Sequence, residues 1–314
     1  MQGVLALGWP ALLLSPLGLG VLGLLIGSFL NVVVHRLPAM MWREWWVDSV
    51  DFQLADVLAW QPLFGGRSKP PVQLAAAAAA VDTELKKLPA ETLWSPGSRC
   101  PHCGHVIKWY ENLPVVSWLA LRGRCSACKA RISVRYPLVE MVTAGLFAAA
   151  AASFGAQPQT LVWCLAIALL LTMALIDFDT TLLPDGLTLP LIALGLGAAL
   201  AGWTGVSAAD SAAGLLAGYG SLWSVGFLYG KLRGVNAMAE GDMKMFGGIG
   251  ALLGWQALPS TLLLAAAVGA VVGIVLILGF GRKRNKPIPF GPYLALGGLA
   301  SIFFGPALRE VWNF

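Results

Sequence analysis

Long hydrophobic runs alternate along the chain with short charged segments. Six runs lack Asp, Glu, Lys and Arg, namely 1–34, 141–176, 186–209, 211–230, 245–281 and 287–308. A helix needs about 20 apolar residues to cross the hydrocarbon core of a bilayer. Burying all six runs in one soluble core is implausible, so the pattern predicts a polytopic, all-α membrane protein.

The two longest internal runs are each interrupted near the middle. Residues 153–159 read Ser-Phe-Gly-Ala-Gln-Pro-Gln, and residues 254–260 read Gly-Trp-Gln-Ala-Leu-Pro-Ser. Gly, Pro and polar residues clustered in this way indicate turns. Each long run therefore predicts two helices, and the expected total is about eight transmembrane helices.

The cations predict how these helices are oriented. With the N-terminus outside, 20 of the 21 Lys and Arg residues fall in segments that face the cytoplasm, and only Arg309 lies outside. No cation precedes the first run and Arg36 follows it, the reverse of a cleaved secretory signal. The cytoplasmic segments are 35–140, 177–185, 231–244 and 282–286.

Composition agrees with this class. Hydrophobic residues make up 57% of the 314 positions and charged residues only 12%, against about 25% charged in a soluble domain. This excludes an ordinary soluble enzyme and a disordered chain. The net charge of +5 reflects orientation in the membrane and does not indicate a nucleic-acid partner.

The pattern also predicts three parts of the chain. Residues 1–34 form a first transmembrane helix, 35–136 a small cytoplasmic domain, and 137–314 a seven-helix membrane domain. Inside the cytoplasmic part, the Ala-rich composition of residues 71–88 predicts a helix.

Two C-x2-C pairs predict a metal site in the cytoplasmic part. The loop between the pairs has 21 residues, close to the spacing of a zinc ribbon (100–128). Four thiolates from two facing turns make a closed tetrahedral zinc site, so the ion is structural. Two disulfides are the alternative, which the reducing cytosol disfavours. The four predicted ligands are Cys100, Cys103, Cys125 and Cys128.

Two acids at predicted helix ends are candidates for catalysis. Asp177 ends the third predicted span and Asp242 precedes the sixth, both on the cytoplasmic side. Carboxyl groups near membrane spans are costly and often functional. A pair that shares one proton can activate water and polarise a peptide carbonyl. A helix cap or a headgroup marker is the alternative, and we favour that alternative for Asp179 and Asp185.

The chain resembles the bacterial type IV prepilin peptidases (prepilin leader peptidase/N-methyltransferase), which are grouped with the intramembrane aspartyl proteases of the G-x-G-D type. The resemblance is weakest over 40–95. It implies that Asp177 and Asp242 are the catalytic pair. The first Gly of G-x-G-D is Ala239 here, which puts the geometry of that loop in doubt. The matching segments are 27–38, the paired cysteines, 111–119, 122–125, 135–140, 177–185, 241–244 and 253–259.

This resemblance implies two activities in the bacterial inner membrane, with the N-terminus periplasmic. The first is cleavage of the short basic leader of type IV prepilins and type II secretion pseudopilins at the cytoplasmic face. The second is methylation of the new N-terminus with S-adenosylmethionine. No glycine-rich donor motif is present, so the donor site is unknown. Asn31 and Glu140 are weak candidates, for which hydrogen bonding between helices is the better explanation.

Two other classes compete with this interpretation. A proton- or cation-coupled transporter would also use carboxylates in the membrane, but it would place them at mid-depth and would show internal repeats. A non-enzymatic scaffold could use the zinc ribbon to dock a secretion machine. Membrane lipids are expected neighbours in every case.

Overall fold

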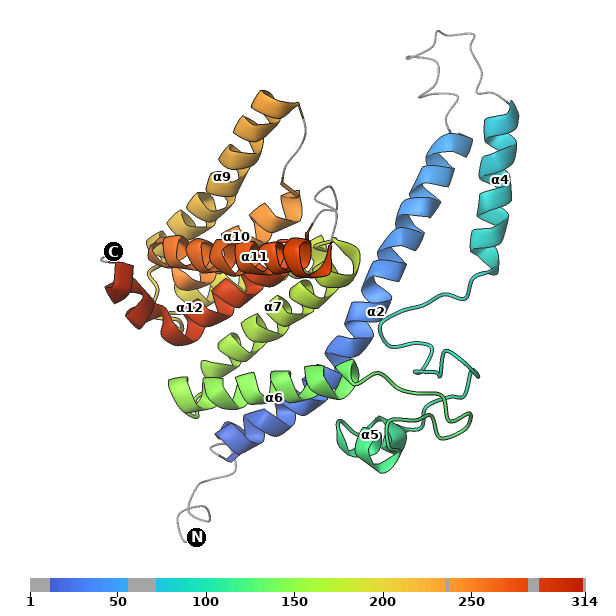
Figure 1. The fold of residues 1–314 in the computed structure, drawn as a ribbon, viewed down its shortest axis with the longest axis horizontal. Coiled ribbons are helices and arrows are strands. Elements are labelled where there is room, and N and C mark those ends of the chain that lie inside the picture. The colour runs from blue at the N-terminus through green and yellow to red at the C-terminus, as the bar shows by residue number, and fades with distance from the viewer. Residues whose placement is uncertain (1–11, 56–71, 235–237, 282–287, 313–314) are drawn as a thin grey trace. The chain divides into compact units, whose positions relative to one another are not determined.

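The computed structural model describes residues 12–55, 72–234, 238–281 and 288–312, and these residues are mostly helical (Figure 1). They include no strand: Arg124 and Arg131 form an isolated antiparallel bridge, and Arg99 and Val106 are also bridge residues. The chain divides into two compact units. One comprises Met1–Asn31 together with Cys100–Phe314, and the other comprises Val32–Arg99.

The smaller unit contains the second half of a long helix and one further helix. Helix α2 (Pro16–Ala55) continues well past residue 34, where the first transmembrane helix was predicted to end. Helix α4 (Val72–Lys87) confirms the helix predicted over 71–88. Arg36 of α2 holds the chain that follows α4 in place. Arg36 donates to the carbonyl oxygens of Thr92 and Pro96 at 2.8 and 2.7 Å.

Seven helices form the bundle of the larger unit, in the order in which the chain runs. Both predicted turns are confirmed, because α6 ends and α7 begins around 155–159, and α10 ends before 254. The seven helices are α6 (Arg135–Phe154), α7 (Thr160–Thr180), α8 (Asp185–Leu200), α9 (Ala208–Arg233), α10 (Glu240–Leu253), α11 (Leu258–Phe280) and α12 (Gly291–Trp312).

Among the described residues, four helical stretches are long and apolar enough to cross a membrane. The eight predicted spans are therefore not confirmed by length and composition. Helix α10 has 14 residues, about 21 Å at 1.5 Å per residue, which is shorter than the bilayer core. The four candidate spans are Pro16–Val50, Arg135–Phe154, Thr160–Thr180 and Trp255–Phe280.

Helix α10 lies between α8 and α9, and small residues make this packing possible. A side chain on Gly214 of α9 would collide with the backbone of Gly250, and one on Gly195 of α8 would stand 2.6 Å from the Leu252 nitrogen. The Ser211 hydroxyl donates to the Ala251 carbonyl oxygen at 2.6 Å. Close backbone contact at glycines is how helices associate in lipid, where burial of apolar surface gives no advantage.

Short elements complete the larger unit. They lie between Cys100 and α6, and between α10 and α11. They are the 3-10 helix η1 (Trp109–Asn112), helix α5 (Val116–Ala120) and the 3-10 helix η2 (Trp255–Ala257).

Candidate functional site

Asp177 lies in the last turn of α7, and the start of α12 holds it there. The helix ends at Thr181, whose backbone adopts the left-handed conformation (φ 55°) and donates its N–H to the Asp177 carbonyl oxygen. The carboxyl group is 5% exposed, and its Oδ2 accepts the Gly291 N–H at 2.8 Å. This amide opens α12 and has no carbonyl partner within that helix, so Asp177 satisfies it.

Asp242 lies in the first turn of α10. It is 8% exposed, and among the described residues no group donates to its buried Oδ1. A buried polar atom without a partner is costly, which makes Asp242 a candidate for a functional role.

Glycine 241 brings the two acid-bearing segments together. A side chain there would stand 2.5 Å from Cβ of Leu183, in the turn that follows Asp177 along the chain. Ala239, which replaces the first Gly of G-x-G-D, has φ −76° and ψ 142°, an extended conformation that any residue adopts. The substitution therefore does not strain the loop.

The two acids that follow Asp177 along the chain, Asp179 and Asp185, each form an ion pair. Asp179 forms a bidentate pair with Arg135 of α6, at 2.8 and 2.7 Å. Asp185 receives both of its contacts from Lys244 of α10, at 2.9 Å each. The Arg135–Asp179 pair and the Gly291 bond join the starts of α6 and α12 to the end of α7, and the Lys244–Asp185 pair joins the starts of α8 and α10. Asp177 and Asp242 thus lie at helix ends that these contacts hold in place.

The four cysteines form a cluster that could hold a metal ion. Their sulfur atoms all lie within 4.8 Å of one another, and Sγ of Cys100 is 3.8 Å from Sγ of Cys128. Two sulfurs that are each about 2.3 Å from a tetrahedral zinc ion would be roughly 3.8 Å apart. The geometry therefore fits zinc, and within the described residues no other cluster of this kind is found.

A polar bridge that the sequence analysis missed joins the two halves of this cluster. The Glu111 carboxylate lies 3.1 Å from Nε2 of His105 and accepts the Lys108 N–H at 2.9 Å. The Ser126 hydroxyl is 3.2 Å from the same His105 nitrogen. Hydrogen bonds from Ser126, Lys108 and His105 lower the pKa of Glu111 from 4.5 to about 2. The bridge stabilises the position of each cysteine turn relative to the other.

Asn31 and Glu140 each hydrogen-bond within the protein. The Asn31 side-chain amide donates to the carbonyl oxygens of Gly27 and Tyr136, each at 3.2 Å, and the second of these bonds joins α2 to α6. The Glu140 carboxylate accepts the Val115 N–H at 2.7 Å. Val115 has φ 59°, which is rare for a β-branched residue, so Glu140 stabilises a strained turn.

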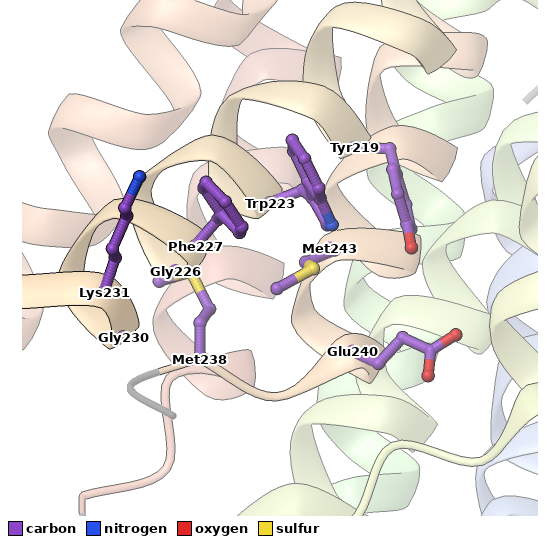
Figure 2. Close-up of a pocket in the computed structure, with 9 residues that line it drawn as sticks. All are labelled: Tyr219, Trp223, Gly226, Phe227, Gly230, Lys231, Met238, Glu240 and Met243. Atoms are coloured by element: carbon purple, nitrogen blue, oxygen red, sulfur yellow. The ribbon is translucent and has the colours of Figure 1, made fainter. Parts of the chain in front are cut away.

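A groove runs between α9 and the start of α10, and it too was missed in the sequence (Figure 2). Its volume is about 730 Å³. The sequence does contain an indication of this groove. Tyr219, Trp223 and Phe227 recur every four residues along α9, and this spacing places them on one face of the helix. The lining residues are Tyr219, Trp223, Gly226, Phe227, Gly230, Lys231, Met238, Glu240 and Met243.

The fold and site define a helical membrane protein with two buried carboxyl groups, one at the end of α7 and one at the start of α10, and a cluster of four cysteines that could hold a metal ion. Two family models match the chain. The Bacterial Peptidase A24 N-terminal domain matches residues 21–154, and the Type IV leader peptidase family matches residues 164–274. The chain belongs to this family of prepilin leader peptidase/N-methyltransferases.

Curated relatives match over nearly the full chain, and each is called "Prepilin leader peptidase/N-methyltransferase". The protein of Burkholderia pseudomallei (strain 1026b) is 44% identical over 91% of this chain and 84% of its own length. The protein of Stutzerimonas stutzeri is 44% identical over 91% of this chain and 89% of its own length. The protein of Pseudomonas aeruginosa is 42% identical over 93% of this chain and 91% of its own length. No solved structure matches the chain.

Proposed function

We propose that this protein cleaves the short basic leader of type IV prepilins and type II secretion pseudopilins and then methylates the new N-terminus. The family membership and the names of the relatives support both activities. The observation that supports the peptidase assignment is the burial of Asp177 at the end of α7 and of Asp242 at the start of α10, where Gly241 packs against Leu183. A coupled transporter is not favoured, because the acids lie at helix ends and the relatives are peptidases by name.

In the proposed mechanism, the two acids share one proton. The ionised carboxylate takes a proton from water, and the resulting hydroxide attacks the scissile carbonyl carbon. The protonated carboxyl donates its hydrogen bond to the carbonyl oxygen. The C–N bond then breaks as the leaving amine gains a proton. The Gly291 N–H keeps Asp177 in one orientation throughout, and the ion pairs of Asp179 and Asp185 keep those carboxylates out of the reaction.

We further propose the predicted topology. Helix α2 and the seven helices from α6 to α12 give eight spans or partial spans of the bacterial inner membrane, with the N-terminus periplasmic. The acids and the cysteine cluster then face the cytoplasm, where the leader of a prepilin lies. The division into a first span (1–34), a cytoplasmic domain (35–136) and a membrane domain (137–314) remains a prediction.

Zinc is the proposed ion of the cysteine cluster. Cys100, Cys103, Cys125 and Cys128 would hold it, and no open position would remain for substrate. The ion would supply folding stability to a segment with little hydrophobic core. It takes no part in the proposed cleavage.

S-adenosylmethionine is the methyl donor that the family name implies. Asn31 and Glu140 hydrogen-bond within the protein, and no contact marks either of them as a ligand of the donor. The assignment of methyl transfer therefore depends on family membership, and no step of that reaction is derived from these residues.

The cleavage assay tests this proposal directly. Purified protein in detergent or nanodiscs is incubated with a prepilin and a labelled methyl donor. Cleavage is expected for the wild type and should be abolished in Asp177→Ala and in Asp242→Ala. Asp82→Asn serves as the control, because it removes a carboxylate of α4 whose ion pair with Lys86 lies outside the helix bundle. Cleavage that persists in both Ala variants would overturn the assignment of the dyad.

A further inference from the structure

The groove between α9 and α10 has a chemical character that suits a cation. Trp223 and Phe227 stack on each other, with ring centroids 5.2 Å apart and planes inclined by 11°. Both rings are open to a ligand, with 48% and 58% of the residue exposed. Glu240 also lines the groove, but its carboxylate forms an ion pair with Lys244 at 2.9 Å and points away from the two rings (Figure 2), so the aromatic faces are the part of the groove that can attract a cation. Aromatic faces attract Lys and Arg side chains, most strongly at Trp.

The packing of the two helices places this groove relative to Asp242. Gly218 of α9 lies against Phe246 of α10, and Gly226 lies against Met238 and Met243. The helices therefore run antiparallel, and by this register Asp242 lies opposite Leu222, one residue before Trp223. The groove and the dyad share the first turn of α10.

The direction of α9 decides which part of a substrate enters the groove. From Trp223, the helix continues to Lys231 and Arg233 in its last turn, which is the cytoplasmic end in the proposed topology. Phe227 lies about 6 Å beyond Trp223 along the axis at 1.5 Å per residue. When the scissile bond lies at the level of Asp242, the apolar helix of the substrate remains in the membrane. The leader then extends toward the cytoplasmic end of α9, in the direction of Phe227.

We propose that this groove binds the leader, and that Trp223 and Phe227 hold one of its basic side chains just before the scissile bond. This inference rests on the proposed function. The groove would then select substrates by charge, whereas the dyad supplies the chemistry. Lys231 lies one turn beyond Phe227 and about 12 Å beyond Trp223 along α9. The Trp223 ring, on which Phe227 stacks, is therefore the part of the groove that takes the basic side chain.

Cleavage kinetics measured for enzyme variants with two different leaders test this inference. The first enzyme variant is Trp223→Leu, which keeps an apolar side chain but removes the aromatic face. The first substrate is a prepilin with its natural leader, and the second has its leader Lys and Arg replaced by Gln. We expect Trp223→Leu to lower kcat/KM about threefold to fivefold for the basic leader, mainly through KM. It should leave kcat/KM for the neutral leader unchanged.

Leu228→Ala is the matched control, because Leu228 is 58% exposed on the same helix, as Phe227 is, but does not line the groove. Photo-crosslinking from p-benzoylphenylalanine at position 227 or 228 gives a second readout. Crosslinks from 227 to the leader, and none from 228, would support the proposal. Crosslinks only to lipid or to a labelled methyl donor, or equal losses with both leaders, would overturn it. Absence of any cleavage by the wild type would instead refute the proposed function.

Discussion

Gly291→Ala is expected to disable Asp177 without touching either acid. A Cβ at position 291 would stand 2.7 Å from Oδ2 of Asp177, 3.1 Å from Cγ and 3.2 Å from Cβ. Ordinary contact begins near 3.4 Å, so Oδ2 must retreat by about 0.7 Å. The Gly291 N–H bond to that oxygen, 2.8 Å long, is weakened or lost as a result.

The expected loss follows from these distances. Displacing a catalytic group by about 1 Å can cost roughly 100-fold in rate. A hydrogen bond to a charged group contributes about 1.5–3 kcal/mol. We therefore predict that kcat for prepilin cleavage falls roughly 10- to 100-fold, whereas KM changes by less than about twofold.

The assay is the cleavage rate at saturating prepilin, read alongside thermal unfolding in the same detergent. Gly145→Ala is the control, because a side chain at Gly145 of α6 would meet nothing within 4 Å. It should cleave at the wild-type rate. Wild-type cleavage by a folded Gly291→Ala protein would refute the view that this amide positions Asp177.

Three further variants address the neighbouring structure. Gly241→Ala places a methyl group 2.5 Å from Leu183 and should lower kcat at least tenfold, as measured in the same assay. Cys125→Ser should reduce bound zinc from one ion per chain to none by elemental analysis, with a lower unfolding temperature. Glu111→Gln should make the cysteine region more sensitive to protease. Because the pKa of Glu111 is lowered from 4.5 to about 2, its stabilising effect is present above about pH 4.5 and is lost as the pH falls toward 2. The wild type and Glu111→Gln should therefore become more alike in protease sensitivity as the pH falls.

Much of the fold follows from local chemistry. Charge-free runs predicted the helices, and the Gly- and Pro-containing turns at 153–159 and 254–260 lie where the chain reverses. The four cysteines were predicted as one cluster because two tight turns can present two thiolates each. The end of α2 was not predictable from the absence of charges. That helix runs on to Ala55, past the charged and at least partly exposed residues Arg43, Glu44 and Asp48.

The remaining features of the site depend on contacts between distant segments. The Gly291 amide lies 114 residues from Asp177, and nothing in the local sequence indicates that the start of α12 closes on the end of α7. The same holds for the pairs Arg135–Asp179 and Lys244–Asp185. Propensity and periodicity describe one element at a time, whereas these bonds exist only once the bundle has formed.

The central claim is that Asp177 and Asp242 act as one unit, and the kinetics of three variants test it most directly. We expect Asp177→Asn and Asp242→Asn each to lower kcat for prepilin cleavage by at least about 10³, and the double variant to be no slower than either single one, because the loss of either member already abolishes the shared-proton chemistry. Losses that multiply in the double variant, or a single variant that keeps substantial activity, would contradict the account.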